Sequence, residues 1–380
     1  MKIFFRILFF LIFIIVLASV IAYARGYRFD LEKRLVRSTG IIATTSYPKA
    51  AKIYVNGELK GVTDTNLTLP PENYLVEIKK EGYTSWSKKI NLKGELVINV
   101  DPVLFPVNPS LSPLTNLGII RAFPTEDGDK IVIFASGSAY LFDAGKKTLP
   151  FFPPLNKIVD LSLLPIIDDF KNIQVIFSPD QKQIIVELAQ NSYLLSLEED
   201  NLNPLEVTLS KEALIQAWQT VKDKNTSKIL ETFPEDFDKI ASSSFEIISF
   251  SPNEAKVLYK AKENVELPLM IDPPLISTNQ TPEERLLIKD KIYVYDRKED
   301  KNFSLINPNL KWYFDSRHFI VEEEKKIFIV DYDNTNKQTI YSGPFESSFF
   351  NPTNDGKIVV LINLNSQVNE LPDLYLVGIR

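Results

Sequence analysis

The chain opens with an unbroken run of apolar residues, and beyond it apolar and polar positions alternate over short distances. Residues 7–24 carry no charge and show no polar face. As a helix that rises about 1.5 Å per residue, they would extend roughly 27 Å, close to the ~30 Å hydrocarbon core of a bilayer. A helix in a soluble core normally has one polar side. The pattern therefore predicts an N-terminal transmembrane helix.

The residues around this run have the order of a secretory signal. Lys2 and Arg6 precede it, and Ala22-Tyr23-Ala24 offers small residues for cleavage. However, the apolar part of a cleaved signal peptide has only about 7–15 residues. The greater length here favours an uncleaved signal-anchor over a cleaved signal, with residues 1–38 as anchor and juxtamembrane segment.

Positive charges flank the run on both sides, so its orientation rests on two opposed arguments. More of them follow the run than precede it, at Arg25, Arg28, Lys33, Arg34 and Arg37. Counting charges alone would keep the long part of the chain in the cytoplasm. Long domains, however, are translocated largely regardless of charge, and the signal-like order favours export. We expect a single-pass protein of the cell membrane with the bulk of the chain extracytoplasmic.

Residues 39–105 follow a β pattern. Asn56-Gly57 separates two β-rich runs, and this pair is a strong hairpin signal because both central residues of a type I′ turn need positive φ. In Tyr74–Lys79 the residues alternate, so that Tyr74, Val76 and Ile78 share one face and Leu75 points the other way. Short strands of this kind, separated by turns, predict a small all-β sandwich.

These residues resemble a PEGA domain. The resemblance is carried by Pro48–Gly57, Gly61 and Asn73–Tyr83, although Lys49 and Ala50 stand where the family usually has glutamate and glycine. It implies a cell-surface or envelope module for attachment or spacing, with no catalytic residues. The aromatic residues of this region fit a small β core better than an exposed binding strip, which is the alternative; they are Tyr74, Tyr83 and Trp86.

A turn phrase recurs after a proline-rich linker at residues 106–116. Each copy begins with an aromatic residue, passes through a turn rich in Ser, Pro, Asp, Asn or Gly, and enters a β-branched run. The five copies are Phe123–Lys130, Phe177–Gln183, Phe250–Lys256, Phe314–His318 and Phe350–Lys357.

A second strand follows each copy. These strands are Tyr140–Asp143, Tyr193–Glu198, Ile292–Asp296, Ile327–Asp331 and Leu374–Val377. Such a unit cannot bury its own apolar face, so repeated units must stack, and a closed ring is the propeller solution. The phrase resembles the F-S-P-D-G-x-x-I motif of TolB-like and WD-repeat-like propellers. We expect a five- or six-bladed β-propeller over residues 117–380, and a series of β-sandwiches is the alternative.

A helical insertion interrupts the repeats at residues 210–241. Ser210 is the expected N-cap of a helix over Lys211–Lys224, with a second short helix over Ser227–Thr232 that Phe237–Ala241 continues. An apolar stripe of Ala213, Leu214, Ala217, Trp218 and Val221 gives the first helix a face to bury. Packing of this stripe onto the propeller is favoured over partner binding. Residues 267–284 read as an ordered but irregular loop.

Composition excludes several classes of protein. The chain has no cysteine, which removes disulfides, thiolate metal sites and a cysteine nucleophile. Its formal net charge of −6 lacks the basic footprint of nucleic-acid binding. With 13 glycines in 380 residues, no phosphate-binding glycine loop occurs.

Candidate chemistry is sparse. His318 is the only histidine, and without a G-x-S-x-G motif it is better explained as a structural turn residue than as the base of a catalytic triad. Asp331–Asn336 imitates the start of a calcium loop but lacks its glycine and glutamate, so a hairpin turn is favoured. Glu322–Lys326 reads as a solvated turn. Two carboxylate pairs, Asp168-Asp169 and Glu283-Glu284, are adjacent only in sequence.

We therefore predict no catalytic, cofactor-binding or metal-ligating residue, and the ligand-binding residues stay undefined. The whole arrangement resembles membrane-anchored PEGA proteins. It implies a non-enzymatic envelope protein whose propeller is a binding platform for an envelope protein or a cell-wall glycan. Such a platform predicts exposed aromatic residues on its loop face.

Two alternatives remain open at this stage. One is a propeller hydrolase or lyase, or an enzyme subunit, that acts on envelope peptide or polysaccharide with carboxylates converging in the channel. The other is a sensor that passes binding through the anchor, which would need a separate membrane partner.

Overall fold

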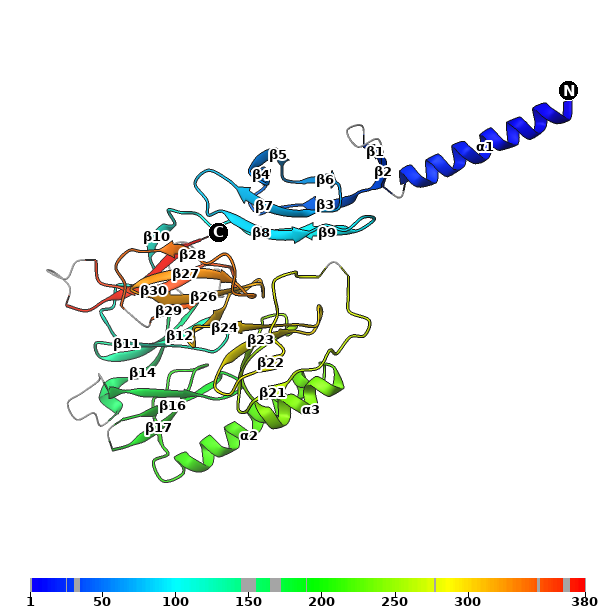
Figure 1. Ribbon diagram of the computed structural model, residues 1–380. Helices are drawn as coiled ribbons and strands as arrows, with labels where there is room; N and C mark the ends of the chain where they lie inside the picture. Colours follow the sequence, from blue (N-terminus) through cyan, green and yellow to red (C-terminus); the bar gives the residue numbers. More distant parts are fainter. Residues whose placement is uncertain are drawn as a thin grey trace. The chain divides into compact units, whose positions relative to one another are not determined.

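The computed structural model describes residues 2–24, 26–30, 35–144, 155–164, 172–188, 190–276, 278–346, 349–364 and 370–379. The protein is mainly β, with an N-terminal apolar helix followed by many antiparallel sheets (Figure 1). It divides into two compact units. Unit 1 comprises Met1–Pro106 and Pro273–Pro282, and unit 2 comprises Val107–Asp272 and Glu283–Arg380.

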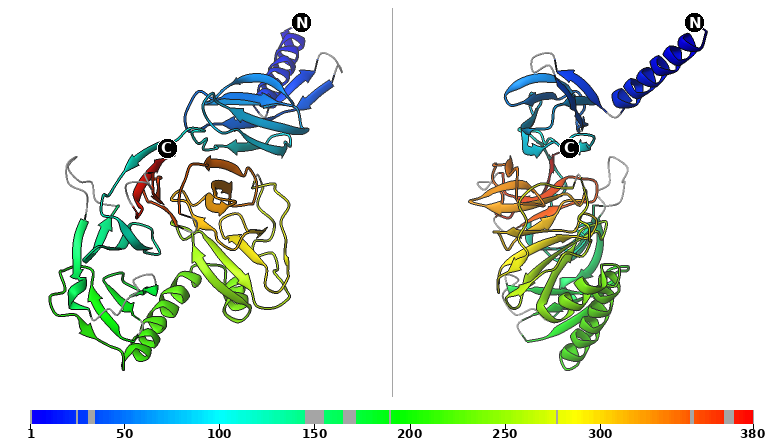
Figure 2. Two further views of the ribbon diagram at one scale, coloured as in Figure 1. Left: turned by 90° about the vertical axis from the view of Figure 1, so that its left-hand side faces the viewer. Right: turned by 45° about the vertical axis from the view of Figure 1, so that its right-hand side comes forward.

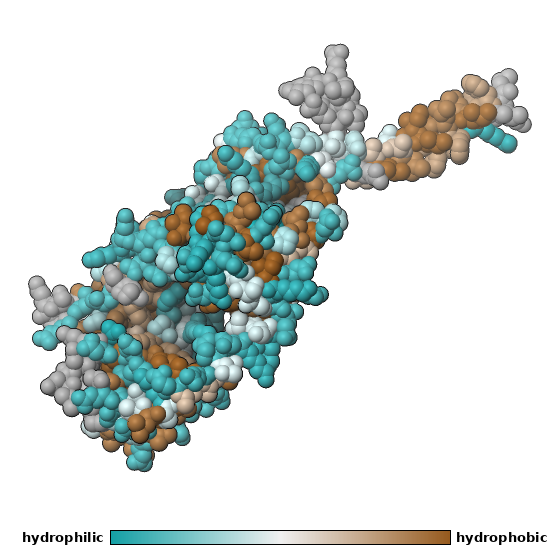
Figure 3. Space-filling model, turned by 60° about the horizontal axis from the view of Figure 1, so that its bottom comes forward, coloured by the Kyte–Doolittle hydropathy of each residue, from teal (hydrophilic) through white to brown (hydrophobic). Residues whose placement is uncertain are grey.

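The apolar run forms helix α1 (Lys2–Ala24). Residues Phe4–Ala24 are long and apolar enough to cross a membrane, and none of that stretch is buried in the protein. Figure 3 shows the hydrophobic surface that the helix leaves exposed. These properties suit either a membrane anchor or a signal peptide. The hairpin β1 (Tyr27–Asp30) and β2 (Leu35–Ser38) follows.

Unit 1 contains two facing sheets. The three-stranded sheet has the order β6-β3-β9 and the four-stranded sheet the order β5-β4-β7-β8. Strands β3 and β9 are parallel, and the other pairs are antiparallel. The strands are β3 (Gly40–Thr44), β4 (Lys52–Val55), β5 (Glu58–Val62), β6 (Thr65–Leu69), β7 (Asn73–Lys79), β8 (Trp86–Asn91) and β9 (Val97–Val100).

Local sequence signals explain this sandwich well. Asn56 and Gly57 have φ values of 50° and 83°, as the predicted hairpin turn requires. Tyr74, Val76 and Ile78 are buried, whereas Leu75 is exposed, which confirms the predicted alternation. The core gathers apolar residues from both sheets, among them Ile42, Ile53, Val76, Ile78, Ile90, Ile98 and Val100.

Unit 2 contains five four-stranded antiparallel sheets among its described residues. Sheet 1 holds β11 (Ile119–Pro124), β12 (Lys130–Ala135), β13 (Ser138–Asp143) and β14 (Leu155–Asp160). Sheet 2 holds β15 (Gln174–Phe177), β16 (Gln183–Glu187), β17 (Ser192–Ser196) and β18 (Leu205–Glu206). Sheet 3 holds β19 (Phe245–Phe250), β20 (Lys256–Ala261), β23 (Ile292–Asp296) and β24 (Lys301–Leu305). Sheet 4 holds β25 (Lys311–Trp312), β26 (His318–Glu323), β27 (Lys326–Asp331) and β28 (Gln338–Tyr341).

Sheet 5 joins the beginning of unit 2 to its end. Its order is β10-β31-β30-β29, with β10 (Ser110–Pro113), β29 (Phe350–Pro352), β30 (Ile358–Ile362) and β31 (Asp373–Gly378). Strand β10 lies inside the proline-rich linker expected at residues 106–116, and the sequence did not predict a strand there. Its strand character comes from pairing with β31, far away in the sequence, and leaves no periodic signal in its own residues.

Hydrophobic clusters connect neighbouring sheets of unit 2. One cluster joins sheets 1 and 2, a second joins sheets 5 and 1, and a third joins sheets 3 and 4. Representative buried members are Phe134 and Ile184 of the first cluster, Ile131 and Val359 of the second, and Leu258 and Phe319 of the third.

Two helices are inserted between sheets 2 and 3. Helix α2 (Lys211–Leu230) and helix α3 (Glu235–Ser244) replace the three pieces expected from the sequence, because α2 continues without a break through residues 225–227. The side chain of Ser210 makes no capping hydrogen bond to α2, so the predicted N-cap was wrong in that respect. Figure 2 shows the two helices as the green pair in unit 2.

The apolar stripe predicted for the insertion is not the face that packs. Ala213, Ala217 and Val221 are exposed, and Leu214 and Trp218 are only half-buried. The buried contacts come instead from the end of α2, from the connection and from α3, through Leu230, Phe233, Phe237 and Ala241. Most residues of α2 are exposed to solvent.

The β20–β23 connection is irregular, as expected. It contains the short ribbon β21 (Val265–Glu266) and β22 (Leu286–Leu287), and residues 267–284 lie between these strands. A 3-10 turn, η1 (Leu161–Leu163), follows β14.

Candidate functional site

The repeated phrase forms a turn between two consecutive strands in each sheet of unit 2, and four of the five turns share one hydrogen-bond pattern. In sheet 2, the Ser178 hydroxyl donates to Asp180 Oδ1 at 2.6 Å and accepts from the Gln183 amide at 2.9 Å. The same pattern recurs at Thr125 with Asp127, Ser251 with Asn253, and Thr353 with Asp355. The sequence repeat is thus a repeat of hydrogen bonding.

Each turn also has a residue in the left-handed region at the same place. These residues are Gly128, Gln181, Glu254, Ser316 and Gly356, with φ values of 75°, 56°, 55°, 60° and 81°. Glycine adopts this conformation without strain, whereas for other residues it costs a modest amount of free energy. The turn therefore defines the repeat even where glycine is absent.

Hydrogen bonds link the turns of neighbouring sheets. The Asn253 amide donates to Ser316 Oγ at 3.0 Å, joining sheets 3 and 4. Tyr313 donates to the Gly356 carbonyl at 2.8 Å, joining sheets 4 and 5. Sheets 5 and 1 meet where Asn351 Nδ2 donates to the Gly128 carbonyl at 2.6 Å. The turns of sheets 3, 4, 5 and 1 therefore form one bonded series.

The turn of sheet 4 contains the only histidine. His318 is buried, with Nδ1 lying 2.7 Å from Asp315 Oδ2 and Nε2 lying 3.2 Å from Asp331 Oδ1. Burial alone would lower the pKa of His318, but the hydrogen bonds to the two carboxylates outweigh it and raise the pKa to about 9. At neutral pH the ring is therefore a cation that donates from both nitrogens.

This arrangement favours the structural interpretation of His318. A general base needs a free lone pair, and here both ring nitrogens face carboxylates. Burial acts to raise the pKa of Asp315, yet the bond to His318 keeps the pKa of this carboxyl below its ordinary value. The group stabilises the connection between two turns of sheet 4.

The stretch that imitates a calcium loop is the turn between β27 and β28. The Asp331 amide donates to the Thr335 carbonyl at 2.9 Å, and Asn336 Nδ2 donates to Asp331 Oδ2 at 2.9 Å. Asp331 Oδ2 thus binds a group within the turn, while Asp331 Oδ1 faces His318. Among the described residues, no group of three or more His, Cys, Asp or Glu side chains is arranged to hold a metal ion. The hairpin prediction is confirmed.

Two other sequence candidates have different outcomes. Glu324 and Lys325 have φ values of 50° and 57° and connect β26 to β27 at the surface, which confirms a solvated turn at residues 322–326. The pair Asp168-Asp169 lies outside the described residues.

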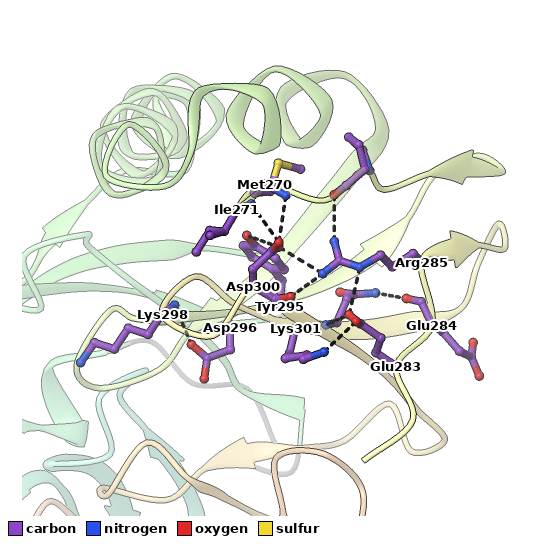
Figure 4. A network of polar contacts seen from close by, with 12 residues as sticks. Met270, Ile271, Glu283, Glu284, Arg285, Tyr295, Asp296, Lys298, Asp300 and Lys301 are labelled. Carbon is purple, nitrogen blue, oxygen red and sulfur yellow. Dashed lines mark hydrogen bonds and ion pairs between the residues drawn. The ribbon is translucent and has the colours of Figure 1, made fainter. Parts of the chain in front are cut away.

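Glu283 and Glu284 point to different partners and do not form a carboxylate pair (Figure 4). Glu283 binds Lys301 Nζ at 2.9 Å and Arg285 Nε at 3.0 Å, whereas Glu284 accepts from Ser304 Oγ at 2.8 Å. Each carboxylate is held by side chains of the same region. They anchor the β20–β23 connection to β24.

Asp300 is the centre of this anchoring network (Figure 4). Its Oδ2 accepts from the amides of Met270 and Ile271 at 2.9 and 3.1 Å. Its Oδ1 accepts from Tyr295 at 3.1 Å and lies 3.2 Å from Arg285. Burial, followed by the neighbouring Asp300 carboxylate, raises the pKa of the Tyr295 hydroxyl, so Tyr295 remains a donor. The network fixes both ends of the connection.

One unusual group was missed by the sequence reading. Lys311, on β25, donates from Nζ to the Phe350 carbonyl at 2.7 Å and lies 4.7 Å from the centre of the Phe350 ring. Among the described residues no carboxylate pairs with it. Burial lowers the pKa of Lys311 to about 8. A single lysine at the start of a short strand gives no sequence signal of such burial.

The aromatic residues that the sequence singled out in unit 1 belong to its core or pack against it. In unit 1, Tyr74 lies in the core, and Tyr83 and Trp86 pack against it, which supports the core interpretation. In unit 2, no aromatic side chain among the described residues is exposed. The expected patch of exposed aromatics on the propeller's loop face is therefore wrong for the described part. The exposed apolar residues there are aliphatic.

Comparison with known families gives one match: the PEGA domain, over residues 39–108. No curated protein matches the chain. Unit 1's sandwich falls within the matched range, which agrees with the resemblance drawn from Asn73–Tyr83.

Solved structures give only distant likenesses. A protein described as TolB of Agrobacterium tumefaciens has a TM-score of 0.22 at 12% identity, covering 66% of this chain and 76% of that one. The CNH domain of AfRom2 has a TM-score of 0.33 at 8% identity, covering 71% and 99%. Likenesses this weak carry no argument about function. The chain thus contains a PEGA domain at residues 39–108, after an N-terminal apolar helix and before a larger antiparallel β unit.

Proposed function

We propose that the chain is a membrane-anchored protein of the cell envelope, whose unit 2 is a five-bladed propeller that binds a partner without catalysing a reaction. The PEGA domain would serve as a spacer between the membrane and this platform. One observation carries the proposal: an exposed helix suited to cross a membrane precedes, by one short hairpin, a PEGA domain, and the resemblance to that family implies work at the cell surface.

Pairing and packing within unit 2 support the propeller part of the proposal. Five sheets of four strands follow one another, and β10 completes the last sheet beside β31. A first strand that pairs in the last blade is how a propeller closes without leaving a free end. The bonded series of turns and the clusters between sheets supply lateral contacts from sheet 3 through sheets 4, 5 and 1 to sheet 2, as neighbouring blades of a propeller would.

The state of the candidate residues supports the non-enzymatic part. His318 is a buried cation between two carboxylates, and Glu283 and Asp300 are saturated by local donors. Purified protein that turned over an envelope peptide or polysaccharide, and lost this turnover in a point variant, would overturn this part.

Membrane topology can be tested with single cysteines because the chain has none of its own. Ile306→Cys places a thiol at a position with 90% exposure in unit 2, and Lys2→Cys places one before the apolar run. In intact cells, a membrane-impermeant maleimide should label the first variant and not the second, and lysis should allow both to react. Labelling of the second variant alone would contradict an extracytoplasmic unit 2.

A further inference from the structure

Three leucines at the outer side of sheet 2 lie in solvent. Leu202 is 68% exposed, Leu205 is 60% exposed, and Leu209 is fully exposed. Single exposed leucines are ordinary on protein surfaces, whereas three of them within residues 202–209 concentrate exposed apolar side chains in one short segment. We call these three residues the leucine corner. They lie close together in the chain, on and beside β18.

The segment that carries the leucine corner is acidic. Residues 197–210 contain four acidic side chains and neither lysine nor arginine. Glu198 pairs with Lys182 and Asp200 with Lys157, each at 3.1 Å. Glu199 and Glu206 are exposed. The corner is thus an apolar surface with an acidic rim.

The backbone of β18 is poorly suited to receive another strand. The strand has only two residues, Pro204 precedes it, and it carries the charged Glu206. Short length, proline and charge are the features that protect edge strands from pairing. A partner of the leucine corner therefore binds through side chains.

The exposed apolar side chains of unit 2 indicate which kind of partner fits. Glycan rings are commonly bound by stacking on exposed aromatic faces. In the described part of unit 2, the large apolar side chains that are exposed are all aliphatic. Aliphatic groups with a charged rim suit the apolar side of an amphipathic helix. A bilayer with anionic lipids has the same sign as the rim and is disfavoured.

We propose that the leucine corner docks an amphipathic, basic helical segment of another protein. The apolar side of that segment covers Leu202, Leu205 and Leu209, and its lysine or arginine residues face Glu199 and Glu206. This inference rests on the proposed function, since it names the partner class of the binding platform.

A defined peptide tests the chemistry directly. Full-length protein in a non-ionic detergent is titrated with a labelled amphipathic helix of leucine and lysine, and with a leucine–glutamate peptide as the control probe. We expect saturable binding of the basic peptide only. Substituting all three corner leucines by serine should weaken it about tenfold or more, because central apolar contacts carry most of the binding energy.

Matched variants separate the corner from general hydrophobicity. The triple variant Leu269→Ser, Leu286→Ser and Ile306→Ser removes leucine-sized side chains of 51%, 70% and 90% exposure elsewhere in unit 2, and should bind like the wild type. The variant Glu199→Lys with Glu206→Lys should lose affinity while keeping the leucines. Equal binding by the two triple variants would overturn the proposal, as would stronger binding to anionic lipid vesicles than to the peptide.

Photo-crosslinking in native membranes distinguishes failure of this inference from failure of the proposed function. The crosslinker is placed at Leu205 or, as a control, at Leu286. A crosslinked product from Leu205 would support docking at the leucine corner if mass spectrometry shows that the captured segment is basic and apolar. Its yield should fall in high salt. Products from Leu286 alone would contradict docking at the leucine corner but agree with partner binding by unit 2. The absence of products from both positions would contradict both proposals.

Discussion

Lys256 and His318 occupy the same position in neighbouring sheets. Each is the first residue of the second strand of its sheet, and each lies opposite the aspartate that ends the third strand. Lys256 Nζ is 3.1 Å from Asp296 Oδ2, and His318 Nε2 is 3.2 Å from Asp331 Oδ1. In sheet 1 the same two places are held by Lys130 and Asp143. His318 is therefore the cation of a repeated cross-strand pair.

This equivalence predicts how stability depends on pH. The pKa of His318 is raised to about 9 in the folded protein from its ordinary 6.5. The stabilisation is thus fully present below pH 6.5 and is lost as the pH rises through 9, by up to about 3 kcal/mol. His318→Lys should fold and should not show this loss between pH 6.5 and 9, because lysine stays protonated there. Urea unfolding at a series of pH values measures the difference.

The neutral variant His318→Gln is the control for that experiment. It should be less stable than the wild type at pH 6, since Asp315 and Asp331 would then lack their cation, and the gap should narrow towards pH 9. A stability gap of constant size between wild type and His318→Gln across this range would contradict a protonated histidine.

The turn glycines allow a second prediction. A Cβ at Gly128 would lie 2.3 Å from the Pro352 carbonyl oxygen, and one at Gly356 would lie 2.7 Å from Phe314 Cε1. Both have positive φ, so alanine adds strain as well as a clash. Gly128→Ala and Gly356→Ala should each cost about 3 kcal/mol or more.

Gly137→Ala is the matched control for the glycine variants. Its φ is 83°, but nothing lies within 4 Å of the added Cβ. Only the backbone strain remains, about 1–2 kcal/mol. If all three alanine variants lost the same stability, contacts between neighbouring turns would not be the reason that Gly128 and Gly356 are glycine.

The features predicted correctly from sequence are those with a local cause. Asn56-Gly57 indicates its turn because both residues must have positive φ, and the hydroxyl-to-carboxylate turn at Ser178 is encoded within a few residues. These signals gave the strands of the PEGA domain and the five turns of unit 2.

The features that were missed depend on residues distant in sequence. Ser110–Pro113 forms a strand by pairing with β31. In the helical insertion, the buried contacts come from Leu230 and residues that follow it, and not from the predicted apolar stripe. The burial of Lys311 likewise depends on Phe350. No periodicity in one segment reports such partners. The exposure of the leucine corner also needed the structure, because leucine in a sequence normally predicts burial.

Lys311 should make the folded state more stable as the pH rises, which is the opposite of the effect predicted for His318. Burial lowers its pKa to about 8, so the charged form weakens the folded state below pH 8, and this cost disappears as the pH rises from 8 towards 10.5. Lys311→Met keeps an unbranched side chain of similar length and removes its charge. At pH 7 it should be about 2 kcal/mol more stable, after allowing for the lost bond to Phe350. Chemical unfolding at pH 7 and pH 10 should show this advantage shrinking, and a less stable variant at pH 7 would contradict the prediction.

The hydrogen bond between Thr115 and Asp373 tests how the beginning of unit 2 is held to β31. Asp373 Oδ1, at the start of β31, accepts from Thr115 Oγ1 at 2.9 Å and from the Leu117 amide at 2.7 Å. Thr115 and Asp373 are buried, so Asp373→Ala would leave the Thr115 hydroxyl without this acceptor, at about 1–3 kcal/mol. We expect unit 2 to unfold at lower urea in this variant and amide exchange to increase first in β10 and β31. Asp355→Ala is the control, because that carboxylate also accepts from a threonine but lies in a turn remote in sequence from β10. Exchange that increased equally in all five sheets would show that the contact stabilises unit 2 as a whole and is not a local latch for its first and last strands.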